Sequence, residues 1–299
     1  MTRAQAPAPA TGSVEHRYAS DGFVVLEGVL DRAEIDGLLA EAVAICRGER
    51  GPIEGAEPVT SAAVAPGATD ATDDEVLRRF LCVHYPHKLS RLMRDTIRHP
   101  GVVGPLTRVV GPNVKAMQSM LFIKSEGRPG QAWHQDEGFI PTRDRSLTAA
   151  WIALDDATTE NGCLWVVPGS HRAGVIYPDR EHDDPRYDCT VESFGFPHTE
   201  EDAVPVELKA GSVLLFNGYL LHKSLPNSGR HGCRRALVGH YMSAESLLPW
   251  APPPADVGMA RADFRDIVLV AGHDPYAWKG TDEIRRPRVR PDRAGGCDR

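Results

Sequence analysis

The spacing of hydrophobic positions along the chain changes near Gly111. Before that point, apolar residues recur every three or four positions, which is the period of an amphipathic helix. The clearest case starts at residues 31–34, Asp-Arg-Ala-Glu, which resemble a capping box. It continues through five apolar positions: Ile35, Leu38, Leu39, Ala42 and Val43. We therefore predict a helical part over about residues 16–110, interrupted by a Pro- and Gly-rich loop at 51–72.

Beyond Gly111 the apolar residues fall into short runs bounded by Gly, Pro and Asn. Runs of four to eight residues with this punctuation are typical of β-strands. Helices followed by many strands indicate an α+β fold, with a β core over about residues 111–245. We predict strands at residues 117–123, 147–154, 164–167, 204–208, 212–216 and 236–242.

Length and end composition suggest how the chain divides. With 299 residues, 41% of them hydrophobic, the chain can bury one large core. Residues 1–15 are rich in Ala and Pro and are predicted to be a disordered lead, followed by a single domain over 16–299 with a tail at 249–299. We find neither a signal-peptide core nor the ~20 consecutive apolar residues that would span a bilayer, and expect no membrane partner.

Charge and cysteine usage narrow the class of protein further. The formal net charge of -7 and a pI near 5.9 argue against a nucleic-acid or anionic-membrane surface. The six cysteines form no C-x-x-C pair, so zinc knuckles and thioredoxin-type chemistry are not indicated. We expect plain buried thiols in a reduced, cytoplasmic protein.

Two histidines and one carboxylate are candidates for a single metal site. In Trp133-His134-Gln135-Asp136, an extended backbone points His134 and Asp136 to the same side. His222, in His222-Lys223-Ser224, is the third ligand that we favour. Such a set leaves coordination positions open, as in non-haem Fe(II) oxygenases and unlike closed structural zinc sites. Four other histidines compete as ligands: His84, His87, His171 and His240. We interpret His171 as structural, with its ring bonded to the backbone of its own turn.

The metal motif stands within an ordered series of motifs. They are Gly111-Pro112-Asn113, Gln118-Ser119-Met120, Trp133-His134-Gln135-Asp136, Ala150-Trp151-Ile152-Ala153-Leu154-Asp155-Asp156, Glu160-Asn161-Gly162-Cys163-Leu164, Pro168-Gly169-Ser170-His171 and His222-Lys223-Ser224. In this order and spacing, from about Asp21 to Met242, the chain resembles the phytanoyl-CoA dioxygenase family.

The resemblance implies a fold, a cofactor and a reaction. The fold is a double-stranded β-helix, a cupin-like jelly roll, with the N-terminal helices packed on it. The metal is Fe(II), and 2-oxoglutarate and O2 are co-substrates that end as succinate and CO2 while the main substrate is oxidised. Because related halogenases lack the metal-binding carboxylate, Asp136 favours hydroxylation over halogenation. Desaturation, epoxidation and ring formation at the same centre are open alternatives.

A 2-oxoglutarate site also needs a cation for the carboxylate that is far from the metal, and an arginine fork suits it. The family arginine opens an Arg-x-Ala-aliphatic strand about a dozen residues after the distal histidine, which selects Arg234 in Arg234-Arg235-Ala236-Leu237. Because neighbouring strand residues face opposite ways, only one of Arg234 and Arg235 can point inward.

The resemblance extends to other residues around the co-substrate. Ser224 matches a serine that assists the same carboxylate, and Met120 and Trp151 match residues lining the pocket, although core packing is their alternative. Arg78 lies near the position of a family lysine, with a solvated helix charge as its alternative. Gln118 is a further candidate, because an amide on an apolar strand needs a partner.

Two segments are natural lids over the mouth of a jelly roll: the acidic, aromatic insertion at 177–202 and the Pro-rich tail at 249–299. The insertion lacks the basic patch that CoA phosphates would require, so we expect a small substrate, either a specialised metabolite or an acyl-type molecule. We expect a monomer or homodimer. The candidate substrate contacts are His182, Tyr187, Phe194, Phe196 and His198.

Two other classes of protein remain open. A cupin-like isomerase or hydrolase would use the same triad with another divalent metal, and would need neither Arg234 nor 2-oxoglutarate. A non-catalytic binding module would keep the fold but would be expected to lose at least one of these residues.

Overall fold

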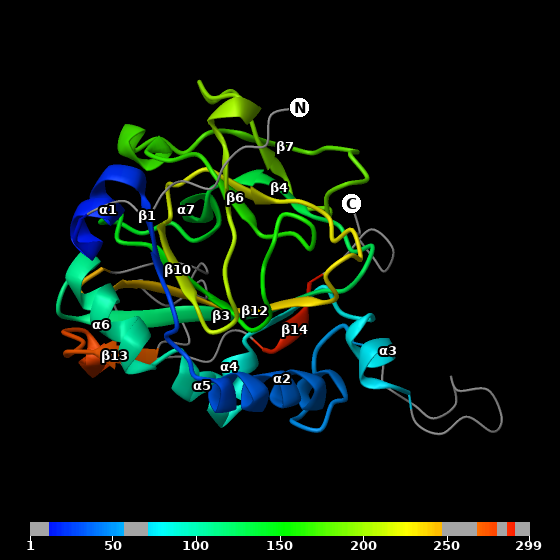
Figure 1. Ribbon diagram of the computed structural model, residues 1–299. Coiled ribbons are helices and arrows are strands. Elements are labelled where there is room, and N and C mark those ends of the chain that lie inside the picture. The colour runs from blue at the N-terminus through cyan, green and yellow to red at the C-terminus, as the bar shows by residue number, and fades with distance from the viewer. Residues whose placement is uncertain (1–11, 57–70, 247–267, 280–285, 291–299) are drawn as a thin grey trace, which may run out of the picture.

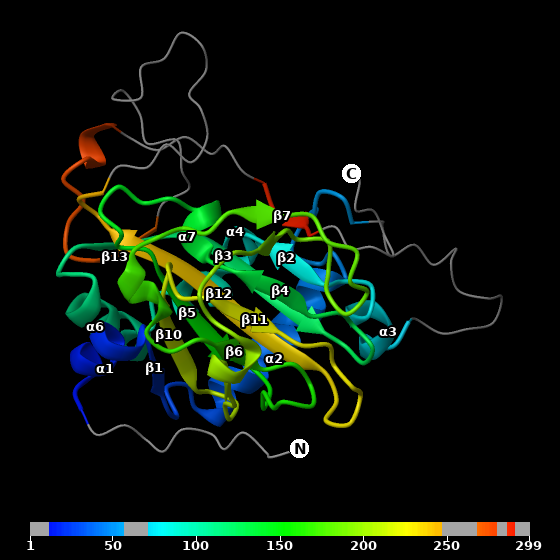
Figure 2. The same ribbon diagram turned by 90° about the horizontal axis from the view of Figure 1, so that it is seen from above.

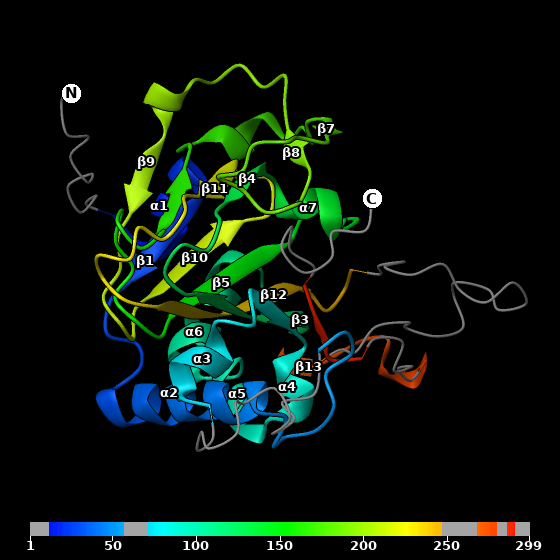
Figure 3. The same ribbon diagram turned by 90° about the vertical axis from the view of Figure 1, so that its right-hand side faces the viewer.

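The computed structural model describes residues 12–56, 71–246, 268–279 and 286–290. Within them, two β-sheets lie face to face, and a group of helices covers the outer face of the larger sheet (Figures 1 and 3). The smaller sheet and the helices therefore lie on opposite sides of the larger sheet.

The N-terminal part of the chain is mainly helical, as predicted. At residues 31–34 the Asp31 side chain accepts a hydrogen bond from the Glu34 amide, and the Glu34 side chain accepts one from the Asp31 amide, which makes a capping box. The helices are α1 (Val14–Asp21), α2 (Arg32–Cys46), α3 (Asp73–Leu77), α4 (Pro86–Leu89), α5 (Arg91–Thr96), α6 (Pro100–Val109) and α7 (Asp136–Phe139), with 3-10 turns η2 (Ser170–Ala173), η3 (Glu200–Asp202) and η4 (Ala277–Lys279). None of these helices is long and apolar enough to cross a membrane.

The larger sheet has the order β1-β10-β5-β12-β3-β2-β14, and β13 also pairs with β3; all its pairs are antiparallel. Its strands are β1 (Phe23–Leu26), β2 (Cys82–His84), β3 (Val114–Lys124), β5 (Thr148–Ala153), β10 (Val213–Asn217), β12 (Arg234–Ser243), β13 (Val268–Ala271) and β14 (Arg288–Val289).

The smaller sheet has the order β4-β11-β6-β9, again antiparallel. Its strands are β4 (Gln131–His134), β6 (Leu164–Val166), β9 (Val204–Val206) and β11 (His222–Ser224), while β7 (Asp179–Arg180) and β8 (Glu192–Ser193) form a separate pair. Seen from above, β4, β11 and β6 lie over β3, β12 and β5 (Figure 2). This two-sheet arrangement is the jelly roll that the family resemblance implied.

Alternation along the central strands divides the core in two. On β3 and β12, Leu121 and Leu237 belong to the cluster shared with the helices, whereas their neighbours Met120, Ala236 and Val238 belong to the cluster between the sheets. Successive strand residues point to opposite faces. The inner face of the larger sheet therefore supplies side chains to the space between the sheets.

Each predicted strand corresponds to an observed one, but several boundaries differ. The region expected to be helical also contains β1 and β2, and the tail supplies β13 and β14. His222 begins its own strand, because a turn separates it from β10. Residues 1–11 of the predicted disordered lead lie outside the described residues, and α1 already begins at Val14, so helix starts within that lead.

The expectation of plain thiols is wrong for one cysteine. Cys189 is disulfide-bonded, whereas four others are free: Cys46, Cys82, Cys163 and Cys233. Cys297 lies outside the described residues.

Candidate active site

His134, Asp136 and His222 come together between the two sheets. His134 ends β4 and His222 begins β11, and the two are paired across these strands with ring centroids 4.0 Å apart. Gln135 is extended, which turns Asp136, the first residue of α7, to the same side as His134. Asp136 Oδ1 lies 3.8 Å from His134 Nε2 and 3.6 Å from His222 Nε2. All three side chains are buried, and their ligand atoms lie within 4.8 Å of one another, a spacing suited to one metal ion.

Backbone carbonyls fix the orientation of both imidazoles. His134 Nδ1 donates to the Ala132 carbonyl at 2.8 Å, and His222 Nδ1 donates to the Leu220 carbonyl at 2.9 Å. A carbonyl can only accept, so the proton lies on Nδ1 and the Nε2 lone pair faces the site. Burial, with the neighbouring His222, lowers the pKa of His134 to about 3. Burial alone would raise the pKa of Asp136, but His222 and His240 outweigh it and hold that pKa below its usual value. Neutral imidazoles and an ionised carboxylate are the metal-binding forms.

The four histidines that were alternative candidates for metal ligands make other contacts. His240 binds Asp136, and His84 lines the cavity described below. His87 Nδ1 lies 2.6 Å from Ser119 Oγ. His171 Nε2 lies 3.2 Å from the Ala19 carbonyl. That bond is to the backbone of α1, so the expectation that His171 bonds its own turn is wrong.

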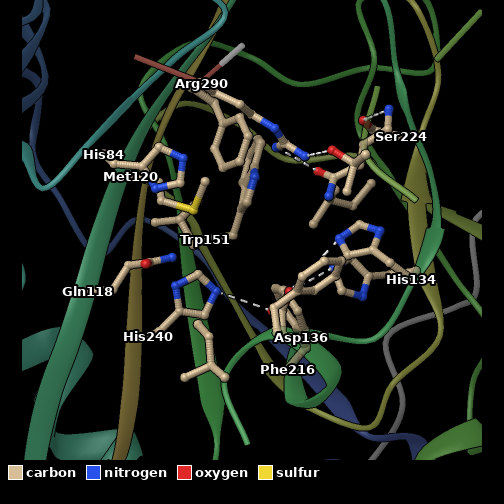
Figure 4. Close-up of a pocket in the computed structure, with 18 of the residues that line it drawn as sticks. His84, Gln118, Met120, His134, Asp136, Trp151, Phe216, Ser224, His240 and Arg290 are labelled. Carbon is tan, nitrogen blue, oxygen red and sulfur yellow. Dashed lines mark hydrogen bonds and ion pairs between the residues drawn. The ribbon is translucent and has the colours of Figure 1, made fainter. Parts of the chain in front are cut away.

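A cavity of about 360 Å³ lies beside the triad. In Figure 4, His84, Gln118 and Met120 form one wall, while His134 and Asp136 lie opposite them. Of the residues expected around a co-substrate, five line this cavity: Gln118, Met120, Trp151, Ser224 and Arg234.

Arg234 and Arg235 face opposite ways. Arg234 is 2% exposed, lies 5.3 Å from the centroid of the Trp151 ring, and has no hydrogen-bond partner for Nε or Nη1. Its burial lowers the guanidinium pKa to about 10. Arg235 instead forms a bidentate pair with Asp155, at 2.7 Å and 2.8 Å. Buried guanidinium nitrogens without acceptors are rare, so Arg234 is suited to an anion that enters the cavity.

Lys124, which the sequence reading missed, supports the Arg234 end of the cavity. It is the cross-strand partner of Arg234, and its ammonium donates to Ser224 Oγ at 2.9 Å and to the Leu225 carbonyl at 2.7 Å. Burial holds the pKa of Lys124 well below its usual value. The only signal in the sequence was a lysine closing an apolar strand.

Arg78 does not reach the cavity. It follows the last residue of α3, its side chain is 60% exposed, and its guanidinium lies 3.8 Å from Glu126 Oε2. The structure places it as a solvated charge, the alternative interpretation of this residue.

The insertion contributes to the cavity through a residue that we did not single out. Thr190 lines the cavity, whereas His182, Tyr187, Phe194, Phe196 and His198 do not. The His182 and Tyr187 rings pack against each other, 6.0 Å apart. Phe196 packs against Trp133 at 6.1 Å, and the Arg180 guanidinium lies over Phe194 at 5.2 Å.

The tail supplies two arginines that the sequence reading also missed. Arg288 and Arg290 flank Val289 on β14 and line the cavity, Arg290 near the top of Figure 4. Arg290 lies 3.3 Å from Asp188 Oδ2, and its guanidinium also contacts Thr190. The alternation Arg-Val-Arg between two prolines was the available signal, since it places both arginines on one face of a strand.

Comparisons with known proteins agree with this fold. The family model described as phytanoyl-CoA dioxygenase (PhyH) matches residues 18–236. The phytanoyl-CoA dioxygenase of Arabidopsis thaliana is 39% identical over 146 residues, which cover 48% of this chain and 50% of that protein. The alignment thus spans about half of that plant relative. The peroxisomal phytanoyl-CoA dioxygenase of Rattus norvegicus is 29% identical over 244 residues, covering 78% of this chain and 69% of that protein.

Solved structures share the fold at lower identity. The non-heme monooxygenase ThoJ in its apo form has a TM-score of 0.64 at 23% identity, covering 88% of this chain and 85% of that one. The epimerase SnoN in complex with Fe3+, alpha ketoglutarate and nogalamycin RO has a TM-score of 0.58 at 22% identity, covering 82% and 90%. From the extent of the family match, the chain belongs to the phytanoyl-CoA dioxygenase family.

Proposed function

We propose that this protein is an Fe(II)- and 2-oxoglutarate-dependent dioxygenase that hydroxylates an unactivated C–H bond of a small molecule. The observation that carries the proposal is the Arg234 guanidinium, which is buried without an acceptor in the same cavity as a metal triad with open positions. A dicarboxylate that reaches from the metal to Arg234 would satisfy both ends.

Different residues would bind the metal and the co-substrate. His134, Asp136 and His222 would hold the metal, and Arg234, with the Ser224 hydroxyl beside it, would bind the carboxylate of 2-oxoglutarate that is far from the metal. When bound, iron and 2-oxoglutarate supply the oxidation of the substrate by O2, with release of succinate and CO2.

Trp151 and Met120 would exclude water from the cavity between these two ends. Both are buried, and Trp151 also packs against the Arg234 guanidinium. In such a partly dry space, a bidentate arginine–carboxylate pair is stronger than it is in water.

The two other classes of protein account for less of the site. A cupin-like isomerase or hydrolase needs the triad but gives no role to a buried, unpartnered Arg234. A non-catalytic module would not need to keep that costly arrangement, since an unsatisfied buried polar group costs about 1–3 kcal/mol. Epimerisation remains the second candidate reaction, because the SnoN structure that matches this fold is described as an epimerase with alpha ketoglutarate bound.

Anaerobic addition of Fe(II) and then 2-oxoglutarate tests the proposal. We expect the weak visible metal-to-ligand band of a chelated 2-oxo acid, and no band in Asp136→Ala. Arg235→Ala is the matched control, because it removes an arginine that points away from the cavity. Iron binding without any 2-oxoglutarate band or heat of binding would overturn the proposal. Once O2 and a substrate are added, succinate release together with an epimerised rather than a hydroxylated substrate would favour the epimerase alternative.

The finer expectations from the sequence stay predictions. They are a cytoplasmic location, a monomer or homodimer, and a specialised metabolite or acyl-type molecule as the substrate.

A further inference from the structure

Arg288 lies on the inner face of the larger sheet, at its edge. It is paired with His84 across β14 and β2, and His84 is paired with Met120 across β2 and β3. Paired residues share a face of a sheet, so these three side chains point to the same side, and all three line the cavity.

Arg288 and Arg234 lie at different places along the cavity. β14 is three strands away from β12, roughly 14 Å at the usual strand spacing. Through the pairs Arg288–His84, His84–Met120 and Met120–Val238, Arg288 lies level with Val238 of β12. Val238 is four residues after Arg234, which corresponds to about 13 Å along the strand. Arg288 therefore belongs to a part of the cavity that the co-substrate arginine does not serve.

Arg290 and Arg288 both line the cavity, but only one of them has a carboxylate partner among the described residues. Arg290 has the buried carboxylate of Asp188 at 3.3 Å. No acidic side chain of the described residues forms an ion pair with Arg288, whose guanidinium lies only over the Tyr85 ring, at 5.4 Å. Beside it, His84 Nδ1 is buried and has no hydrogen-bond partner.

The proposed function assigns no partner to the positive charge of Arg288. Fe(II), the Asp136 carboxylate, 2-oxoglutarate and the Arg234 guanidinium have formal charges that cancel. Arg290 and Asp188 also cancel, and Lys124 does not line the cavity. Glu54 is the backbone bridge partner of Arg288 but forms no ion pair with it. A partly buried guanidinium favours a paired anion, and the described residues leave Arg288 without one.

We propose that the main substrate is a monocarboxylic acid whose carboxylate binds Arg288, with His84 Nδ1 as a further polar contact, an inference that rests on the proposed function. A single missing charge fits a carboxylate better than a phosphate monoester, which carries close to two. A carboxylate also matches the flat guanidinium fork.

The cavity also has an apolar lining near the metal triad. Phe139 lines the cavity while remaining 43% exposed, and its ring lies 6.1 Å from that of His134. Ile140 also lines the cavity and is buried. The hydrocarbon part of the acid would cover Phe139, with its carboxylate at Arg288 and its reacting carbon near the triad.

Equilibrium binding tests the inference without turnover. The protein is loaded with Zn2+, which is unreactive toward O2, and with 2-oxoglutarate. Saturation-transfer NMR and calorimetry then measure a set of small aliphatic and aromatic carboxylic acids, each beside its own primary amide and the phosphate monoester of the matching alcohol.

The variants are Arg288→Gln, Arg288→Lys as a partial rescue, and Arg286→Gln as a matched control that removes an exposed arginine outside the cavity. We expect acids to bind at least tenfold more tightly than their amides, and Arg288→Gln to weaken acids about 10- to 100-fold while leaving amides unchanged. Arg286→Gln should behave as the parent protein.

Several results would overturn the inference. They are equal binding of acids and amides, no binding of either, a preference for the phosphate monoesters, or an Arg288→Gln variant that loses 2-oxoglutarate affinity as strongly as acid affinity. Failure of the proposed function looks different, because the parent protein would then not bind 2-oxoglutarate at all.

Discussion

His240 Nε2 donates a hydrogen bond to Asp136 Oδ2 at 3.2 Å, while Oδ1 of the same carboxylate faces His134 and His222. His240 thus holds the oxygen that the two ligand histidines do not share, and fixes the rotation of the carboxylate. Its other ring nitrogen, Nδ1, is buried without a partner. Partners of this kind orient metal ligands and typically change metal affinity 10- to 100-fold when removed.

We expect His240→Ala to weaken metal binding about tenfold while the protein stays folded. His240→Gln should recover part of the affinity, because its amide can still donate to Asp136. Competition with a chelator of known affinity, using Zn2+ and Fe(II), measures the effect. His87→Ala is the control, since His87 is buried outside the cavity. Unchanged affinity in His240→Ala would show that Asp136 is held without His240.

Arg234→Ala should raise the KM for 2-oxoglutarate roughly 30-fold or more, because the loss of a buried charge partner costs about 2–5 kcal/mol. Arg235→Ala should leave that KM unchanged and lower stability by only about 1 kcal/mol, since its pair with Asp155 is partly exposed. Steady-state kinetics and urea unfolding of both variants separate the two roles. A larger KM effect in Arg235→Ala would show that the inward residue has been misassigned.

The pair Arg290–Asp188 ties the tail strand to the insertion, with side chains 12% and 4% exposed. Asp188→Asn or Arg290→Gln alone should destabilise the protein by about 2–4 kcal/mol, because each leaves a buried charge unpaired. The double variant should be less destabilised than the sum of the two. Urea unfolding of all four proteins gives the coupling energy, and strictly additive losses would mean that the two residues act independently.

His87 predicts a specific loss of stability in acid. Burial, and to a lesser extent Lys88, lowers its pKa from 6.5 to about 4. The unfolded chain therefore binds the proton first as the pH falls, so the stability is complete above pH 6.5 and is lost between pH 6.5 and about 4. At 1.36 kcal/mol per pH unit, the loss is of the order of 3 kcal/mol.

His87→Asn should remove that part of the pH dependence. Unfolding free energies of the parent and variant at several pH values between 7 and 4 measure the difference, in which the carboxylates common to both proteins cancel. Equal slopes in the two proteins would contradict the prediction.

Local patterns allowed much of the β core and the metal ligands to be predicted. The strands around Met120, Trp151 and Val238 were found because each is an apolar run ended by turn residues. His134 and Asp136 could be paired because one extended residue separates them. Alternation along a strand indicated that only one of Arg234 and Arg235 points inward, and the family resemblance selected Arg234.

The missing parts of the site depend on contacts between distant segments. Lys124 lies at the Arg234 end of the cavity only because β12 pairs with β3 and places Arg234 beside it. Arg288 reaches the cavity only because β14 pairs with β2. His182 and Phe196 also depend on such contacts: the His182 ring packs against Tyr187 and the Phe196 ring against Trp133, and neither lines the cavity. No spacing within one segment encodes such pairings.

The pairing of Arg288 with His84 also has a consequence for folding. These residues are about 200 positions apart, so their contact closes one of the longest loops in the molecule, which is entropically costly and slow to form. The other strands of the larger sheet pair without β14, which within that sheet pairs only with β2 and also forms a backbone bridge with Glu54. The jelly roll can therefore assemble before the edge that carries Arg288 is complete, which would leave the cavity open on that side until β14 pairs with β2. Metal incorporation during folding would then take place through that open side.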